Sequence, residues 1–121
     1  MKRFKNILFF ADSSEEITPA LQRAVQLADS NHARLTLVDV IEPVKTPNEI
    51  ISRFNVELDE LLKLHRQKIL ERLIQLLGEE HNLIYTKILT GQPFVEVIKY
   101  VESGGFDLLI KMAQPPSGIG E

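Results

Sequence analysis

Asp12 is the residue whose type and position are best suited to bind a ligand. It directly follows the apolar run 7–11, and a carboxylate at the end of a buried strand can accept hydrogen bonds from a ribose or from the edge of a base. The alternative is that Asp12 only starts a loop and helps to satisfy the amides at the start of the next helix. Asp39 lies in a second apolar run, 34–41, and is expected either at the solvated end of that strand or paired with a nearby basic residue. A ligand role for Asp39 is the less favoured alternative.

Gly118 and Gly120, near the end of the chain, would let the backbone approach a phosphate closely. Pro115 and Pro116 remove two N–H donors from the same loop, and a phosphate cradle depends on such donors. The sequence contains no Gly-x-x-x-x-Gly-Lys-Ser/Thr, and no Gly-x-Gly-x-x-Gly follows the first apolar run. A stiff loop that crosses the end of a sheet is therefore at least as good an interpretation.

The three histidines, His32, His65 and His81, are scattered, and no pair has the spacing of metal ligands. No serine, histidine and carboxylate are grouped in a recognisable nucleophile motif, although a triad assembled in space stays open. The sequence thus predicts no metal site and no catalytic residue.

The composition is that of one ordinary globular domain. The chain has 121 residues, of which 44% are hydrophobic and 26% charged, and it has no cysteine that could form a disulfide. The net charge of −3 argues against a nucleic-acid partner. No apolar run approaches the ~20 residues of a membrane helix, and the apolar run after the basic start is too short for a signal peptide. We therefore expect a cytoplasmic protein without a membrane or nucleic-acid partner.

Continuous apolar runs alternate with segments of helical spacing, which predicts strands that are buried on both faces. The predicted strands are residues 7–11, 34–41, 83–89 and 106–111, and the predicted helices are residues 17–30, 47–78 and 94–103.

This β-α-β-α-β-α-β order predicts an α/β fold with a parallel sheet that helices cover on both faces. Ser13 or Ser14 is expected to cap the first helix, with Glu15 and Glu16 near its positive end. A break in the long second helix is possible near Asn55. Ligands of such sheets bind at the carboxyl ends of the strands, where the strand order reverses.

Charged residues of the long helix predict a solvated face. The acidic stretch 57–60 is followed by Lys63, Arg66 and Lys68, a spacing that allows ion pairs between successive turns.

The segment Asn6-Ile-Leu-Phe-Phe-Ala-Asp-Ser-Ser-Glu-Glu, a helix with Ala24 and Ala28, and the strand after Ala33 together resemble the universal stress protein family. Gly91-Gln92-Pro93 ahead of the third helix and the segment 106–111 fit the same family. The resemblance covers essentially the whole chain. It implies a three-layer, doubly wound parallel sheet similar to the adenine-nucleotide alpha-hydrolase-like domains, with strand order 3-2-1-4-5.

The resemblance also implies a nucleotide site. The ATP-binding members use the aspartate after strand one, a valine backbone after strand two and a Gly-x-x-Gly loop after strand four. Asp12 and Val40 match the first two parts, and the predicted cofactor-binding residues are Ala11, Asp12 and Val40. Met112 and Pro115 stand where the loop's glycines would be, so their side chains would crowd a triphosphate. Weak or no ATP binding is therefore expected.

The family's fifth strand, through which many relatives dimerise, has no counterpart in the sequence. The resemblance thus implies that residues 1–121 are a C-terminally incomplete stress-protein domain, most similar to the first domain of tandem members. The fourth strand is then expected to form an exposed sheet edge.

Two functions remain open. One is a regulatory or binding module of a bacterial-type stress response, without intrinsic catalysis, that acts through self-association or a second stress-protein domain. The other is a member that binds ATP or AMP with at most slow hydrolysis. A nucleotidyl transferase would need a His-x-x-His-type motif, which the sequence lacks.

Overall fold

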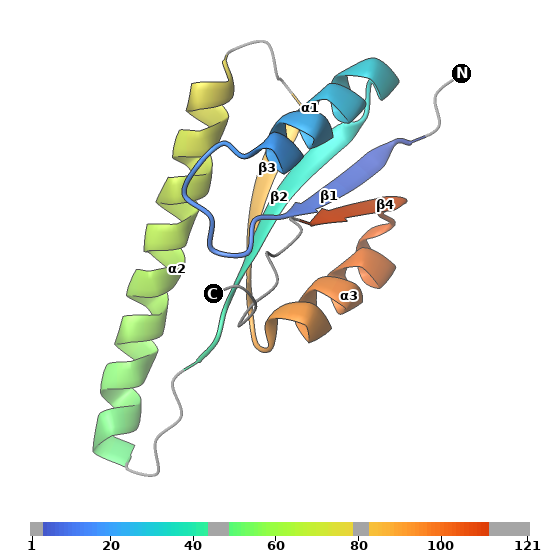
Figure 1. Cartoon of the computed structure of the whole chain (residues 1–121). Coiled ribbons are helices and arrows are strands. Elements are labelled where there is room, and N and C mark those ends of the chain that lie inside the picture. The colour runs from blue at the N-terminus through green and yellow to red at the C-terminus, as the bar shows by residue number, and fades with distance from the viewer. Residues whose placement is uncertain (1–3, 44–48, 79–82, 112–121) are drawn as a thin grey trace, which may run out of the picture.

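The computed structural model describes residues 4–43, 49–78 and 83–111, with side chains from residue 57 onward in the second helix. Strands and helices alternate along the chain as predicted (Figure 1). The elements are β1 (Asn6–Phe10), α1 (Pro19–Asn31), β2 (Arg34–Ile41), α2 (Glu49–Leu77), β3 (Ile84–Thr90), α3 (Pro93–Gly104) and β4 (Leu108–Lys111). β2 has the predicted limits, and the other elements differ from the predictions by one or two residues at an end. α2 is continuous, so the possible break near Asn55 does not occur.

The described strands form one parallel sheet in the order β3-β2-β1-β4. β1 is an inner strand that pairs with β2 on one side (Phe9 opposite Leu37) and with β4 on the other (Phe9 opposite Ile110). The strand order therefore reverses at β1, as the doubly wound prediction requires. Among the described residues there is no counterpart of the family's fifth strand, and β4 forms a sheet edge.

Helices cover the sheet on both faces (Figure 1). Ile7 and Phe9 of β1 point to the face covered by α1 and α2, where Leu70 and Leu73 of α2 complete the core. The alternate residues of β1 point to the opposite face, where Val97 of α3 completes a second cluster. Because β1 and β2 are covered on both faces, neither strand shows the polar alternation of a half-solvated sheet.

Helix α1 begins later than predicted. Its N-cap is Thr18, whose Oγ1 accepts a hydrogen bond from the N–H of Leu21 at 3.1 Å. The prediction that Ser13 or Ser14 would cap this helix is therefore wrong, and no acidic residue lies in its first turn. None of the described helices combines the length and the apolar character needed to cross a membrane.

The amino ends of β1 and β4 are tied together by Asp107. Its carboxylate accepts hydrogen bonds from the N–H of Lys5 at 2.9 Å and from the N–H of Asn6 at 3.2 Å. In return, the N–H of Asp107 donates to the carbonyl of Asn6 at 2.9 Å. This exchange fixes the register of two strands that lie about a hundred residues apart in the chain.

Candidate functional site

A hollow of about 410 Å³ lies at the carboxyl ends of the strands, and Asp12 forms part of its wall. The segment after β2 and the beginning of α3 supply the rest of the lining, which is Glu42, Gln92, Pro93, Phe94 and Val95. Its size falls within the ~300–1,000 Å³ of small-molecule sites. The structure thus places Asp12 at the end of the sheet where doubly wound folds bind ligands.

The start of α3 forms one side of this hollow. The N–H of Gly91 donates to the carbonyl of Ile41 at 3.0 Å, which anchors the turn before α3 to the end of β2. Gln92 is the N-cap but makes no capping hydrogen bond with its side chain, and Pro93 follows in the first turn. The first backbone N–H groups of a helix have no partner within it, so this end of α3 offers donors to a ligand.

Phe94 contributes an aromatic face to the same hollow. Its ring is about half exposed and meets the ring of Phe10 edge-on, with centroids 6.1 Å apart. The Nζ of Lys111 lies 4.7 Å from the centroid of the Phe94 ring. A planar ligand could pack against such a ring, which holds its position through contacts on two sides.

Asp12 lies in a tight turn with an uncommon backbone conformation. The N–H of Ser14 donates to the carbonyl of Ala11 at 3.0 Å, and the two central residues, Asp12 and Ser13, have φ of 50° and 67°. Two positive φ values are typical of a type I′ turn, in which glycine and asparagine are favoured. For other L-residues this conformation costs roughly 1–2 kcal/mol each, so contacts from elsewhere must stabilise the turn.

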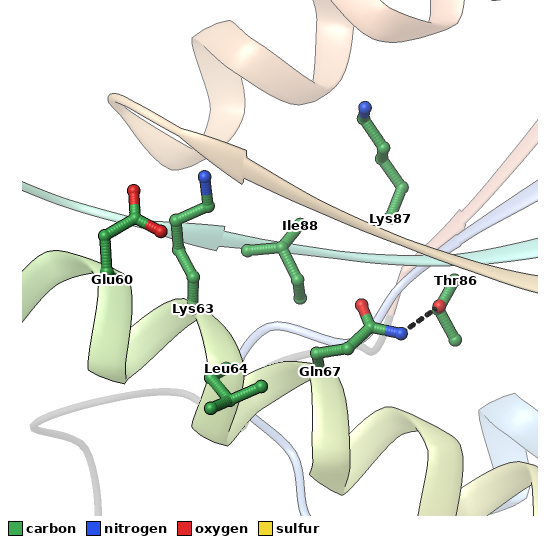
Figure 2. A pocket seen from close by; sticks show the side chains of 7 residues that line it. All are labelled: Glu60, Lys63, Leu64, Gln67, Thr86, Lys87 and Ile88. Atoms are coloured by element: carbon green, nitrogen blue, oxygen red, sulfur yellow. Dashed lines mark hydrogen bonds between the residues drawn. The ribbon is translucent and has the colours of Figure 1, made fainter.

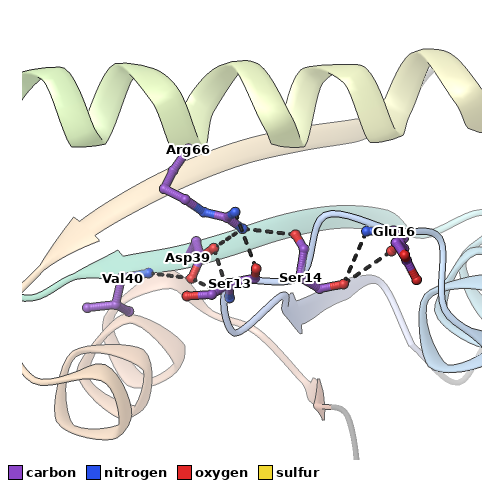
Figure 3. A network of polar contacts seen from close by, with 6 residues as sticks. All are labelled: Ser13, Ser14, Glu16, Asp39, Val40 and Arg66. Atoms are coloured by element: carbon purple, nitrogen blue, oxygen red, sulfur yellow. Dashed lines mark hydrogen bonds and ion pairs between the residues drawn. The ribbon is translucent and has the colours of Figure 1, made fainter.

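Those contacts come from a buried ion pair between Asp39 of β2 and Arg66 of α2 (Figure 3). The residues are 1% and 8% exposed. The N–H of Ser13 donates to both carboxylate oxygens of Asp39, at 3.2 and 3.3 Å. Arg66 donates from Nη1 to the carbonyl of Ser13 at 3.4 Å and from Nη2 to the carbonyl of Ser14 at 3.0 Å.

This network decides between the two predictions for Asp39. Pairing with a basic residue is confirmed, and a solvated position is wrong. The prediction of a solvated face is also wrong for Arg66, although it holds for exposed Lys68 on the same helix. A usable signal was present, because Arg66 precedes buried Leu70 and Leu73 by four and seven residues, which places it on the apolar stripe of α2.

Ala11 and Val40, the other predicted binding residues, do not line the hollow at Asp12. Ala11 is 1% exposed, and its N–H donates to the carbonyl of Val38 at 2.9 Å. The side chain of Val40 packs in the α3-side core, and its N–H donates to Oδ1 of Asp39 at 2.9 Å. Of the three predicted binding residues, the structure therefore brings Asp12 alone to this hollow.

A second hollow, of about 380 Å³, lies between α2 and the edge strand β3 (Figure 2). Gln67 crosses from α2 and donates to Oγ1 of Thr86 at 2.6 Å and to Oε2 of Glu71 at 2.9 Å. The walls also carry Lys63 and Glu60, so charges of both signs face it. Its polar contacts attach α2 to the sheet edge, a common way to cover an exposed strand.

The two remaining candidates that the structure describes, His32 and His65, line neither hollow. His32 is the exposed C-cap of α1, with φ of 52°, and His65 is exposed on α2. No group of three or more histidine, aspartate or glutamate side chains that could hold a metal occurs in the described part of the chain. His81, Met112, Pro115, Pro116, Gly118 and Gly120 lie outside the described residues.

Comparison with known proteins identifies the family. The model of the universal stress protein family matches residues 3–121. A universal stress protein UspA from Lactobacillus plantarum superposes with a TM-score of 0.81 at 22% identity, over 98% of this chain and 83% of that one. A family member from Burkholderia pseudomallei gives a TM-score of 0.59 at 19% identity, over 91% of this chain and 82% of that one.

A third solved structure is a universal stress protein in complex with cAMP. It has a TM-score of 0.52 at 18% identity and covers 88% of this chain and 70% of that one. No curated protein sequence matches the chain. The match of the family model over nearly the whole sequence shows that the chain belongs to the universal stress protein family.

Proposed function

We propose that this protein is a regulatory stress-protein module that binds the nucleoside part of an adenine nucleotide at the Asp12 hollow and does not turn it over. The observation that carries the proposal is the position of Asp12. Asp12 lines a ligand-sized hollow at the carboxyl ends of the strands. A relative with a bound cyclic nucleotide supports this class of ligand.

The lining suits a nucleoside. A carboxylate can accept hydrogen bonds from both hydroxyls of a ribose, which is the role we assign to Asp12. The half-exposed ring of Phe94 offers a face for a planar base, and stacking of a base on an aromatic ring contributes ~1–3 kcal/mol.

The same lining suits a triphosphate less well. Asp12 and Glu42 both line the hollow, and their negative charges disfavour a highly charged anionic ligand. The sequence prediction that Met112 and Pro115 replace loop glycines points the same way. We therefore expect AMP or cAMP to bind more tightly than ATP, and we expect no hydrolysis product.

Isothermal titration of the protein with AMP, cAMP and ATP tests the proposal. Asp12→Asn is the informative variant, because asparagine tolerates positive φ and the change removes only the charge and one acceptor. We expect it to weaken AMP binding about tenfold, as a lost hydrogen bond to a charged group would. Glu102→Gln, which neutralises an exposed carboxylate of α3 away from the hollow, is the matched control and should leave affinity unchanged.

Three results would contradict the proposal: no binding of any nucleotide, equal affinity of Asp12→Asn and the parent protein, or release of phosphate from ATP during prolonged incubation. The last result would favour the alternative, a nucleotide-hydrolysing member of the family.

A regulatory module must also act on a partner, and we propose that this protein acts through self-association or through contact with a second stress-protein domain. Leu58, Leu61 and Leu64 on α2 are 44%, 63% and 51% exposed. Their three-residue spacing keeps them on one side of the helix, where they form a partly apolar surface. Light scattering with and without AMP tests this proposal, and a monomer under all conditions at high concentration would exclude self-association.

A further inference from the structure

We propose that Arg66 and Asp39 form a positioning pair that holds the Asp12 turn in its ligand-binding conformation and couples that turn to helix α2. The inference rests on the proposed nucleotide site and adds to it a pair of residues that do not line the hollow. Arg66 and Asp39 are positioning residues, because they act on the ligand only through the backbone that carries Asp12.

The pair contacts both sides of Ser13. The Asp39 carboxylate accepts from the N–H of Ser13, and the Arg66 guanidinium donates to its carbonyl. Both peptide groups of the second positive-φ residue are thereby fixed. Asp12 is the residue immediately before it, so the direction of the Asp12 side chain depends on these contacts.

The guanidinium of Arg66 is chemically suited to hold the turn. Arg66 reaches the Asp39 carboxylate and the carbonyls of Ser13 and Ser14 at once, which requires several donors in a fixed plane. The Nε of Arg66 is buried and makes no hydrogen bond to any described group. In the position from which Arg66 contacts the turn, its Nε donor stays buried and unpaired among the described groups. An unpaired buried donor lowers the stability of the fold, so stability alone does not explain this position.

The pair also joins three separate parts of the fold. Asp39 belongs to β2, Arg66 to α2 and the two serines to the turn after β1 (Figure 3). The next residue of α2, Gln67, contacts Thr86 of β3 (Figure 2). A displacement of α2 therefore moves Arg66, and linkage requires that a ligand which orders the turn also stabilises this position of α2.

The experiment compares Arg66→Met with Arg72→Met. Methionine keeps much of the side-chain volume at position 66 but removes the donors. Arg72 is exposed on the same helix, so the same substitution there controls for effects on α2 itself. The double variant Asp39→Asn/Arg66→Met removes both charges and serves if the single variant does not fold.

Two readouts are measured on variants that circular dichroism shows to be folded. Hydrogen exchange of the Ser13 and Ser14 amides, which donate to Asp39 and Ala11, reports on the turn. Titration with AMP reports on the site. We expect Arg66→Met and the double variant to speed exchange of these amides by roughly tenfold or more through a local opening of the turn, which is faster than the global unfolding that limits exchange of the amides of β1 and β2. AMP affinity should fall about tenfold, and Arg72→Met should change neither readout.

The proposal is overturned if a folded Arg66→Met or double variant keeps parental exchange at Ser13 and Ser14. It is also overturned if these two amides exchange in the variants only through the same global unfolding as the amides of β1 and β2, since the pair would then only contribute to global stability. Failure of the parent protein to bind AMP would remove the proposed function, whereas the exchange readout would still decide whether the pair positions the turn. If AMP binds the parent and Arg66→Met with equal affinity, the pair has no role in positioning the site.

Discussion

Removal of Arg66 should destabilise the protein far more than the loss of an ordinary surface arginine. Asp39 is almost completely buried, and without Arg66 the partners of its carboxylate among the described residues are the N–H groups of Ser13 and Val40. An unpaired charge in such a position typically costs about 3–5 kcal/mol. The hydrogen bonds from Arg66 to the carbonyls of Ser13 and Ser14 are only partly buried. Without Arg66 these carbonyls can accept hydrogen bonds from water, so their loss adds little to the cost.

This cost can be measured by urea unfolding. The sequence has no tryptophan, so circular dichroism is the suitable signal. With a typical slope of ~2 kcal/mol per M urea, a loss of ~4 kcal/mol lowers the midpoint of Arg66→Met by about 2 M. Asp39→Asn/Arg66→Met should recover ~1–2 kcal/mol of that loss, because the uncompensated charge is gone while an amide oxygen can still accept from Ser13.

Arg72→Met is the matched control and should stay within about 0.5 kcal/mol of the parent protein. The reasoning would be refuted if Arg66→Met cost less than ~1 kcal/mol, which is the range of exposed ion pairs. It would also fail if the double variant were less stable than Arg66→Met, since the loss would then not come from an unpaired Asp39.

Three further substitutions test the local structure by the same unfolding assay. Thr18→Ala should cost about 1 kcal/mol by removing the N-cap of α1, and an unchanged midpoint would argue against this cap. Gly91→Ala should cost ~1–3 kcal/mol, because φ is +140° and the new Cβ would lie 2.6 Å from Cγ of Glu96; Glu96→Ala in the same chain should relieve only the contact part. Leu70→Ala should cost ~2–5 kcal/mol, whereas Leu76→Ala, at a residue 60% exposed, should cost much less, and equal losses would contradict the assigned face of α2.

The course of the chain through the sheet was predictable from local patterns. The segment 34–41 is rich in β-branched and other apolar residues, as is typical of a buried strand, and the limits of β2 were predicted correctly. The same property explains what could not be predicted. In a strand without alternation, Asp39 carries no sign of which face it points to, so its partner could not be inferred.

The prediction that Ser13 or Ser14 caps α1 is wrong for a related reason. Ser13 and Ser14 have the residue type of a helix cap, but their backbone groups bind residues that lie 26 and 52 positions further along the chain. Local propensity does not contain contacts over such separations. For Thr18, the preference for caps and the following proline act together, and the helix begins there.

The site was predicted in part. Asp12 was placed at the correct end of the sheet from its position after the first strand, and the structure adds the hollow around it. Phe94 and Glu42 could not be assigned, because their approach to Asp12 depends on how the start of α3 meets the end of β2.

The place of β1 between β2 and β4 has a consequence for how the protein is made. Synthesis runs from the N-terminus at ~5–20 residues per second, so β1 and β2 exist for seconds before Leu108, the first residue of β4, is added. During that interval the β4 side of Ile7–Phe10 has no intramolecular strand to pair with, and this apolar segment resembles those that pair between chains. If ribosomes stop between Thr90 and Leu108, the released chains would expose this edge of β1, and the exposed edges of two chains could pair with each other.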